Sequence, residues 1–104
     1  MNVLATAIVA LSLYSTPHVD GATRGLVVAE CTDWFVVESR SGYALLEWMG
    51  GYTPIAGDEV VGEFETFGRQ EIYRVGDGRE TQVWVQDYWM SARAAAEAYV
   101  ERCD

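Results

Sequence analysis

The stretch EWMGGYTPIAGDEVVGEF, from Glu47 to Phe64, joins two apolar segments through paired glycines, a proline and a Gly-Asp turn. Glycine readily adopts the positive φ angles that a tight corner requires, and proline fixes the direction in which the chain leaves it. The stretch therefore predicts the corner of a small β-barrel. Tyr52 is the one residue that a corner does not explain, and it leaves a ligand-binding loop as a second interpretation.

Short segments of strand character lie on both sides of this corner. They are rich in aromatic and β-branched residues, and glycine-containing turns separate them. The expected strands are 25–31, 34–39, 43–49, 59–67 and 81–89, and residues 70–75 are expected to continue the ribbon. The turn Ser39-Arg40-Ser41-Gly42 predicts a hairpin between the second and third strands. Gly62, inside the fourth predicted strand, indicates a bulge or a sharp barrel bend.

The hydrophobic period changes after the last predicted strand. Ser91 is a favourable N-cap, and residues of one kind then recur at helical spacing. These residues are Ala92, Ala95, Ala96, Tyr99 and Cys103. Because the stripe is mostly alanine, the helix can approach a sheet closely. The pattern predicts a mainly β protein, a small antiparallel five- or six-stranded barrel with a C-terminal α-helix.

The segments GLVVAE, SRSG and GDEVVGEF resemble the pattern of OB-fold-like small β-barrels over most of residues 25–89. The resemblance implies the OB-like architecture, in which a Gly-Asp turn commonly leads into a strand that bends at a following glycine. OB-folds bind oligonucleotides on a basic, aromatic strand face. This chain carries a net charge of −9, and its seven basic residues are all arginine. We therefore do not expect nucleic acid or an anionic membrane surface as a partner.

The N-terminal segment contains an apolar run without charge, from Val3 to Leu13. The run is too short to span a bilayer but has the length of the hydrophobic region of a secretory signal. No basic residue precedes it and no clean cleavage site follows, so a buried helix or strand remains the alternative. We expect residues 1–22 to be a signal peptide or short anchor plus linker, and residues 23–104 to be the barrel domain. The protein is then exported, periplasmic or extracellular, either free or tethered by this segment, with no integral membrane span in the mature chain.

The only two cysteines, Cys31 and Cys103, lie far apart and almost bracket the predicted domain. An even number of cysteines in an exported chain predicts a disulfide, and Cys103 lies on the predicted helical stripe. Two buried thiols in a cytosolic protein are the alternative. A catalytic thiol is not expected, because the nearby Asp33 would raise the pKa of Cys31.

Carboxylates are the remaining candidates for chemistry, because the sole histidine, His18, lies in the leader. Glu63 and Glu65 share a face if their strand is regular, and Glu71 would lie across from them. Three such groups suit a hard cation or an acid–base pair, so a carboxylate-dependent enzyme or a cation-binding protein is the alternative function. The ordinary explanation is a solvated strand face. We therefore expect no metal, no cofactor and no enzymatic activity.

Aromatic residues are numerous for so small a domain. They include Trp34, Trp48, Tyr52, Trp84, Tyr88 and Trp89. Core packing explains some of them, whereas Trp84 lies on the face opposite Val83 and Val85. We expect an apolar platform for a sugar, a peptide or a partner protein, and its candidate residues are Tyr52, Trp84, Trp48 and Trp34. The sequence thus predicts a small exported, disulfide-linked binding or interaction module.

Overall fold

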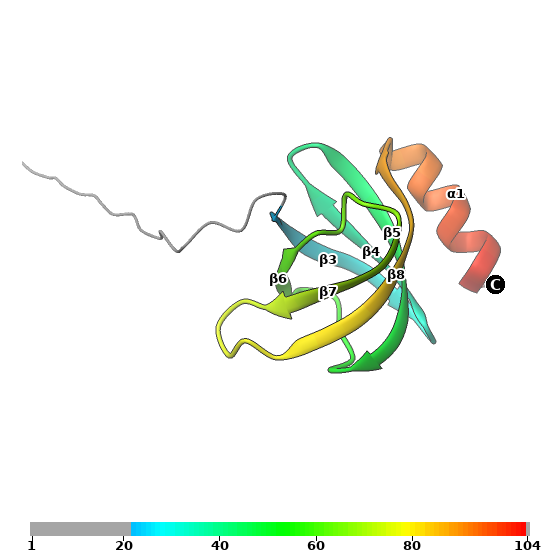
Figure 1. Ribbon diagram of the computed structural model, residues 1–104. Coiled ribbons are helices and arrows are strands. Elements are labelled where there is room, and N and C mark those ends of the chain that lie inside the picture. Colours follow the sequence, from blue (N-terminus) through cyan, green and yellow to red (C-terminus); the bar gives the residue numbers. More distant parts are fainter. Residues whose placement is uncertain (1–21, 104) are drawn as a thin grey trace, which may run out of the picture.

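The computed structural model describes residues 22–103, so His18 and the predicted leader, apart from Ala22, lie outside the described residues. Six antiparallel strands form a closed barrel, and one helix packs on its outside (Figure 1). The elements are β3 (Thr23–Cys31), β4 (Trp34–Ser39), β5 (Gly42–Gly51), β6 (Glu59–Gly62), β7 (Gly68–Arg74), β8 (Glu80–Met90) and α1 (Ala92–Cys103). The predicted mainly β barrel with a C-terminal helix is confirmed, with six strands where an OB-fold has five.

The barrel consists of two three-stranded meanders that pair with each other along both sides. The first contains β3, β4 and β5, and the second contains β6, β7 and β8. β3 pairs with β6 and β5 pairs with β8, in both cases antiparallel. Closure leaves these strands without the exposed backbone row of an open sheet edge, which is a common site of aggregation.

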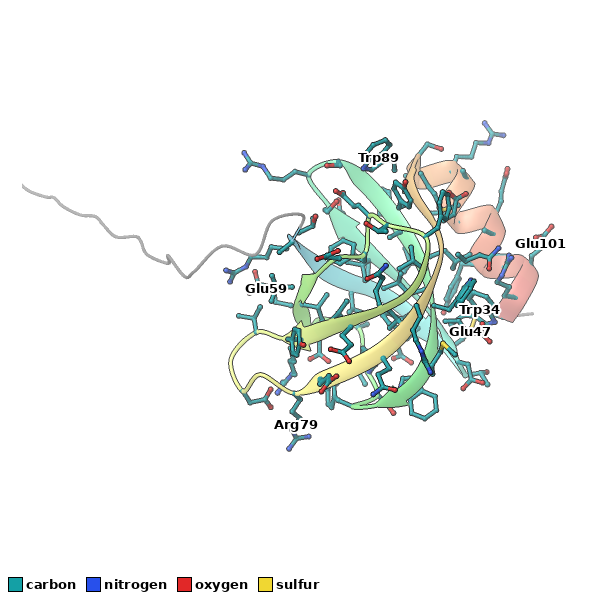
Figure 2. All side chains as sticks on the ribbon, viewed as in Figure 1. Trp34, Glu47, Glu59, Arg79, Trp89 and Glu101 are labelled. Atoms are coloured by element: carbon teal, nitrogen blue, oxygen red, sulfur yellow. A yellow bond between two sulfur atoms is a disulfide. The ribbon has the colours of Figure 1, made fainter. Side chains whose placement is uncertain are left out.

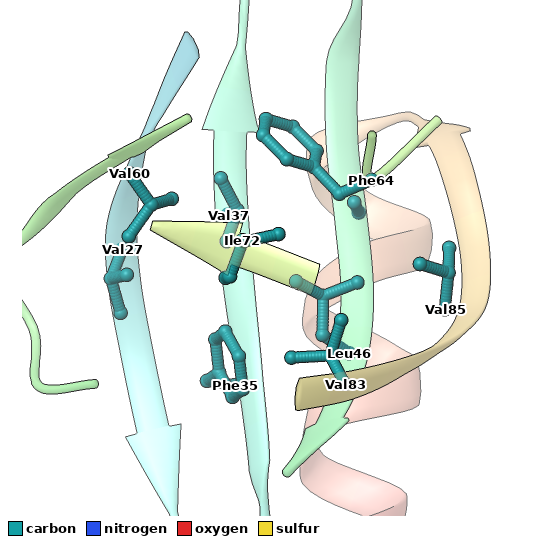
Figure 3. Close-up of a cluster of buried hydrophobic side chains, with 10 residues drawn as sticks. Val27, Phe35, Val37, Leu46, Val60, Phe64, Ile72, Val83 and Val85 are labelled. Atoms are coloured by element: carbon teal, nitrogen blue, oxygen red, sulfur yellow. The ribbon is translucent and has the colours of Figure 1, made fainter. Parts of the chain in front are cut away.

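The barrel interior is filled by side chains from all six strands and from the segment between β6 and β7 (Figure 3). This core consists of Val27, Phe35, Val37, Ala44, Leu46, Val60, Phe64, Ile72, Val83 and Val85. Complete burial of a large aliphatic or aromatic side chain contributes about 1.5–3 kcal/mol. In β8, Val83 and Val85 point into this core and Trp84 points outward, as the sequence predicted.

The fourth predicted strand is shorter than expected. β6 ends at Gly62, and residues 63–67 form a turn instead of continuing the strand. A Cβ atom at Gly62 would lie 2.7 Å from the carbonyl oxygen of Glu71 and 2.8 Å from Cγ2 of Ile72, so β7 passes too closely for any other residue. Phe64 then folds into the barrel and is fully buried. The prediction of a strand over residues 59–67 was wrong because burial of Phe64 requires the chain to leave the sheet.

The stretch Glu47–Phe64 forms a corner of the barrel, between the end of β5 and the start of β6. Gly51 has a φ of +82°, and a side chain there would collide with the carbonyl of Glu80. Gly50 has no positive φ angle, so only the second glycine of the pair is required by the backbone.

Helix α1 lies against the outer face of β4, β5 and β8 (Figure 1). The hydroxyl of Ser91 accepts a hydrogen bond from the Ala94 N–H at 3.1 Å, which confirms the predicted N-cap. Ala95 is buried against Val36 and Leu45, and Ala98 and Tyr99 pack beside it. The contact face is displaced from the predicted stripe, since Ala92 and Ala96 are exposed and border a shallow apolar groove of about 230 Å³.

A disulfide between Cys31 and Cys103 joins the end of β3 to the last turn of α1, with 5.9 Å between the two Cα atoms. It closes a loop with a sequence separation of 72 residues. Tyr99 adds a hydrogen bond from its hydroxyl to the carbonyl of Glu30, at 2.9 Å. The disulfide and this hydrogen bond fix the C-terminal half of α1 on the barrel.

Replacing both cysteines by serine (Cys31→Ser with Cys103→Ser) should lower the free energy of unfolding by about 4 kcal/mol, because the unfolded chain gains loop entropy. Urea unfolding followed by tryptophan fluorescence measures this difference. The oxidised wild type and the wild type kept in reductant serve as the matched pair. A loss below about 1 kcal/mol would mean that packing of α1, and not the covalent link, holds the helix in place.

Candidate functional site

The loop between β5 and β6 is organised around the buried carboxylate of Asp58. Oδ2 accepts hydrogen bonds from the Tyr52 hydroxyl at 2.6 Å and from the Ile55 N–H at 3.0 Å. Oδ1 accepts a hydrogen bond from Nε of Arg74 at 3.1 Å. The backbone carbonyl of Asp58 accepts a further one from the Val27 N–H at 2.8 Å. Asp58 therefore connects the corner to β3 and to β7.

The environment of Asp58 favours its ionised form. Burial alone would raise the pKa of this carboxyl group, because it disfavours the charge. The hydrogen bonds from Tyr52, Ile55 and Arg74 and the positive charge of Arg74 outweigh burial, so the pKa of Asp58 lies below its ordinary value. The same hydrogen bond raises the pKa of the Tyr52 hydroxyl. This arrangement stabilises the corner and engages both carboxylate oxygens of Asp58 in hydrogen bonds within the protein.

Two of the predicted site residues, Tyr52 and Trp48, belong to this corner. The Tyr52 ring lies between Arg74 and Arg79, with each Cζ atom 5.5 Å from the ring centroid. Its carbonyl accepts hydrogen bonds from the Trp48 indole N–H at 3.2 Å and from the Thr81 hydroxyl at 2.8 Å. Trp48 also packs against the barrel core. Both aromatic residues are thus engaged in holding the corner together.

The other two predicted residues, Trp34 and Trp84, lie on the outer wall of the barrel. Both pair with Glu47 across neighbouring strands, so the three side chains form one row on the outside of the barrel. Figure 2 places Trp34 and Glu47 near the C-terminal end of α1. Trp34 is half-buried, and the guanidinium of Arg102 covers its ring at 4.7 Å from the centroid. Trp84 is 43% exposed. The structure therefore separates the four predicted residues into two pairs and does not form one platform from them.

The two most exposed aromatic side chains within residues 22–103 lie elsewhere, at one end of the barrel. We call this surface the aromatic ridge and define it by Phe67, Tyr88 and Trp89. The ring centroids of Phe67 and Tyr88 are 4.7 Å apart, and those of Tyr88 and Trp89 are 5.0 Å apart. Phe67 is 61% exposed and Trp89 is 65% exposed, whereas Tyr88 packs partly against the core. Figure 2 places Trp89 at the opposite end of the barrel from Arg79, which flanks Tyr52.

Trp89 has an unusual backbone conformation. Its φ of +56° lies in the left-handed region, which costs a residue with a side chain about 1–2 kcal/mol. The cause is a bulge, in which Tyr88 and Trp89 of β8 face the single residue Ala44 of β5. The bulge turns the chain from β8 into α1 and directs a large indole ring outward where glycine would fit with less strain.

The carboxylates predicted as an alternative site are not brought together as one group. Glu65 lies in the turn after β6 and accepts hydrogen bonds from the Thr23 hydroxyl at 3.2 Å and from the Ser39 hydroxyl at 3.4 Å. Glu63 and Glu71 line an open depression of about 480 Å³ over β6 and β7. The expectation that Glu63 and Glu65 share a strand face was wrong, because the strand ends before both.

Glu71 also interacts with two neighbours outside the predicted set. Its carboxylate accepts a hydrogen bond from the Tyr73 hydroxyl at 3.0 Å. A hydrogen bond with Glu71, together with its negative charge, raises the pKa of Glu80. Within residues 22–103 no three His, Cys, Asp or Glu side chains are grouped so that they could hold a metal ion. The same part of the chain contains no helix with the length and apolar character to cross a membrane.

The comparisons with known proteins assign the chain to no family. No protein-family model matches it, and no significant similarity to a curated protein or to a solved structure is found. The function must therefore be argued from the surfaces described above.

Sequence reasoning passed over the aromatic ridge. Tyr88 and Trp89 were read as part of the last strand and Phe67 as the end of the fourth, with no contact expected among them. Their contact depends on the turn at residues 63–67 and on the bulge in β8. Gly62 indicated a bend but not where Phe67 would lie after it, and no local signal marks the bulge. The adjacent Tyr88 and Trp89, separated from the N-cap Ser91 by Met90, are the one feature that pointed to this position.

The Asp58 network should make stability pH-dependent. The folded-state pKa of Asp58 is depressed, so its contribution is fully present above the unfolded pKa of about 3.9 and is lost as pH falls through the folded pKa. Asp58→Asn should lower the free energy of unfolding by about 2 kcal/mol at neutral pH. Urea unfolding at several pH values should show this gap narrowing as the pH falls from about 4 through the lower folded-state pKa, where the wild-type carboxyl also becomes neutral.

A matched pair of tyrosine variants isolates the hydrogen bond at the corner. Tyr52→Phe should lower the free energy of unfolding by about 1 kcal/mol, and Tyr73→Phe, which removes an exposed hydroxyl bound to Glu71, should lower it by less than half of that.

The Asp58→Asn experiment has its own contradicting outcome. If the difference in unfolding free energy between wild type and Asp58→Asn stays constant down to pH 2, the acid sensitivity arises at other carboxylates.

The backbone strain at Trp89 can be measured with paired substitutions. Both Trp89→Gly and Trp89→Ala remove the ring, but only glycine accepts the left-handed conformation without a steric cost. Trp89→Gly should therefore be more stable than Trp89→Ala by about 1 kcal/mol in urea unfolding. At Trp84, in regular strand, the order should reverse, with glycine less stable than alanine by about 0.5–1 kcal/mol. The same order at both positions would mean that Trp89 is not strained.

Proposed function

We propose that this protein is an exported interaction module that binds a partner protein through the aromatic ridge. The observation that carries the proposal is the exposure of Phe67 and Trp89 around Tyr88 on one barrel end. Tryptophan and tyrosine are enriched among the residues that dominate binding energy at protein interfaces. Clustered exposed aromatic side chains on a soluble domain commonly mark an interaction site.

The shape of the ridge favours a protein partner over a small ligand. Small-molecule sites are concave, whereas Phe67 and Trp89 project from the barrel end. Neither the depression beside Glu63 nor the groove beside α1 includes a ridge residue. Exposed rings that lie outside both hollows are suited to insertion into a pocket on another protein.

The ring orientations distinguish a protein partner from a stacked sugar. The planes of Phe67 and Tyr88 are tilted by 53°, and those of Tyr88 and Trp89 by 82°. A sugar ring stacks on a flat aromatic face, and the three rings present no common plane. Their faces and edges point in several directions, as is usual for aromatic side chains that interdigitate with a protein surface.

The strain at Trp89 supports a functional role for that ring. Costly backbone conformations occur mainly at binding and catalytic sites, where the local geometry serves the function. The same turn would form at lower cost with glycine at position 89. A bulky indole at this position is therefore explained better by what it contacts than by the stability of the barrel.

Export remains part of the proposal. The disulfide between Cys31 and Cys103 supports it, because such bonds persist in oxidising compartments and are rare in the cytosol. The apolar run from Val3 to Leu13 supports it from the sequence. The carboxylate alternative rests on Glu63 and Glu71 alone, because Glu65 is turned toward Thr23 and Ser39.

Photo-crosslinking in the cells that make the protein tests this proposal. p-Benzoylphenylalanine is placed at Phe67 or at Trp89 in the full-length chain, and the cells are fractionated after irradiation. We expect one discrete protein adduct from each ridge position in the exported fraction. The intact mass of the uncrosslinked protein, before and after alkylation without reductant, reports leader cleavage and the disulfide.

Position 84 supplies the matched control, since Trp84 is also an exposed aromatic residue but lies on the side wall. An adduct at position 84 with none at 67 or 89 would move the binding surface to the row that contains Trp34 and Glu47. A full-length cytosolic chain that takes up two alkyl groups would remove the export argument.

A further inference from the structure

Resting on the proposed function, we infer that the partner segment bound by the aromatic ridge is basic, with lysine or arginine side chains bordering an apolar contact. The inference comes from the charges that surround the ridge. Three segments form this end of the barrel, namely 39–42, 63–67 and 87–90. Their charged residues are Glu63, Glu65, Asp87 and a single arginine, Arg40.

The negative charge at this end of the barrel is not neutralised by arginine ion pairs. Within residues 22–103, the carboxylates that form such pairs are Asp58, Glu59, Asp77, Glu97 and Glu101. Glu63, Glu65 and Asp87 form none. The charge of these three carboxylates is therefore available to an incoming partner at this end of the barrel.

Two of these carboxylates are held in place by neutral donors. Glu65 is bound by the hydroxyls of Thr23 and Ser39, at 3.2 and 3.4 Å. Asp87 accepts a hydrogen bond on Oδ1 from the Tyr88 N–H at 2.9 Å. Neutral donors orient a carboxylate and leave its charge intact. The ridge is therefore flanked by fixed acceptors that retain lone pairs for a cationic side chain.

Exposed aromatic rings beside carboxylates provide two attractions for the same cation. An arginine or lysine over the face of Trp89 strengthens binding roughly two- to fivefold through cation–π attraction at an exposed site. The net charge of −9 extends the attraction, because it speeds the approach of a basic partner and slows that of an acidic one. Arg40, on the hairpin that contacts the Trp89 backbone through Gly42, offsets part of the local charge.

The experiment compares two short soluble peptides that differ only in charge, one with arginine and leucine and one with glutamate in place of arginine. Each is titrated into the full-length ¹⁵N-labelled protein, and chemical shifts of backbone amides and of the indole N–H groups are recorded. We expect the basic peptide to shift signals of residues 63–67 and 87–90, including the Trp89 indole. We expect the acidic peptide to shift none of them. Binding of the basic peptide should weaken as salt rises to about 0.3 M, because charge attraction is screened.

Variants separate the aromatic part from the charge part. Phe67→Ala and Trp89→Ala should each weaken the basic peptide about tenfold. Glu65→Gln removes the charge, keeps an oxygen acceptor for one of the two hydroxyls of Thr23 and Ser39 and places an N–H donor at the other. It should weaken binding of the basic peptide about threefold. Two control substitutions, Trp84→Ala and Glu97→Gln, make the same kinds of change away from the ridge and should alter affinity by less than about twofold.

The outcomes distinguish the inference from the proposed function. Equal binding of both peptides at the ridge would overturn the basic partner and leave the ridge as an interface. Basic-peptide binding that Trp89→Ala and Trp84→Ala weaken equally would be non-specific charge attraction and would also overturn the inference. Ridge shifts seen only with phosphatidylcholine vesicles or with a neutral oligosaccharide would reassign the ridge to lipid or sugar. If no probe shifts the ridge, both the inference and the proposed function fail.

Discussion

The buried carboxylate of Asp58 is the interaction on which the barrel closure depends. It lies in the loop that connects the first meander to the second. The carboxylate accepts three hydrogen bonds, from that loop and from β7, and the backbone carbonyl of the same residue accepts a fourth from β3. A buried carboxylate without these donors would be strongly unfavourable, so the corner forms as a unit or not at all. With the corner formed, β6 is positioned to pair with β3 and the two meanders close on each other.

The two ends of the barrel are built on opposite principles. At the Asp58 end, aromatic and charged side chains satisfy one another, with Tyr52 held between Arg74 and Arg79. At the ridge end, Phe67 and Trp89 are exposed and the neighbouring Glu65 and Asp87 have no arginine partner. The first arrangement contributes to stability. The second leaves apolar area and charge available, which is the condition for binding another molecule.

Sequence patterns predicted most of the fold because they act locally. The aromatic and β-branched composition of WFVVES, the alternation around Val83 and Val85, the turn before Gly42 and the N-cap at Ser91 each depend on neighbouring residues, and each is found in the structure. The boundary of the fourth strand was predicted wrongly, because the chain leaves the sheet after Gly62 and buries Phe64 in the barrel core. The face of α1 that contacts the barrel differs from the predicted stripe, because packing on Val36 and Leu45 sets the orientation of the helix.

The sequence by itself determined the class of the protein, a mainly β barrel with a C-terminal helix, and paired two cysteines that the structure joins. Hydrophobic period, turn chemistry and cysteine number are properties of the chain before it folds. Only the tertiary structure decided which aromatic residues are exposed together. Hydrogen bonds hold Tyr52 and Trp48 in the corner. Phe67 contacts Tyr88 because of the turn after β6 and the bulge in β8. Such contacts join segments distant in sequence, and their geometry is set by the closed barrel as a whole.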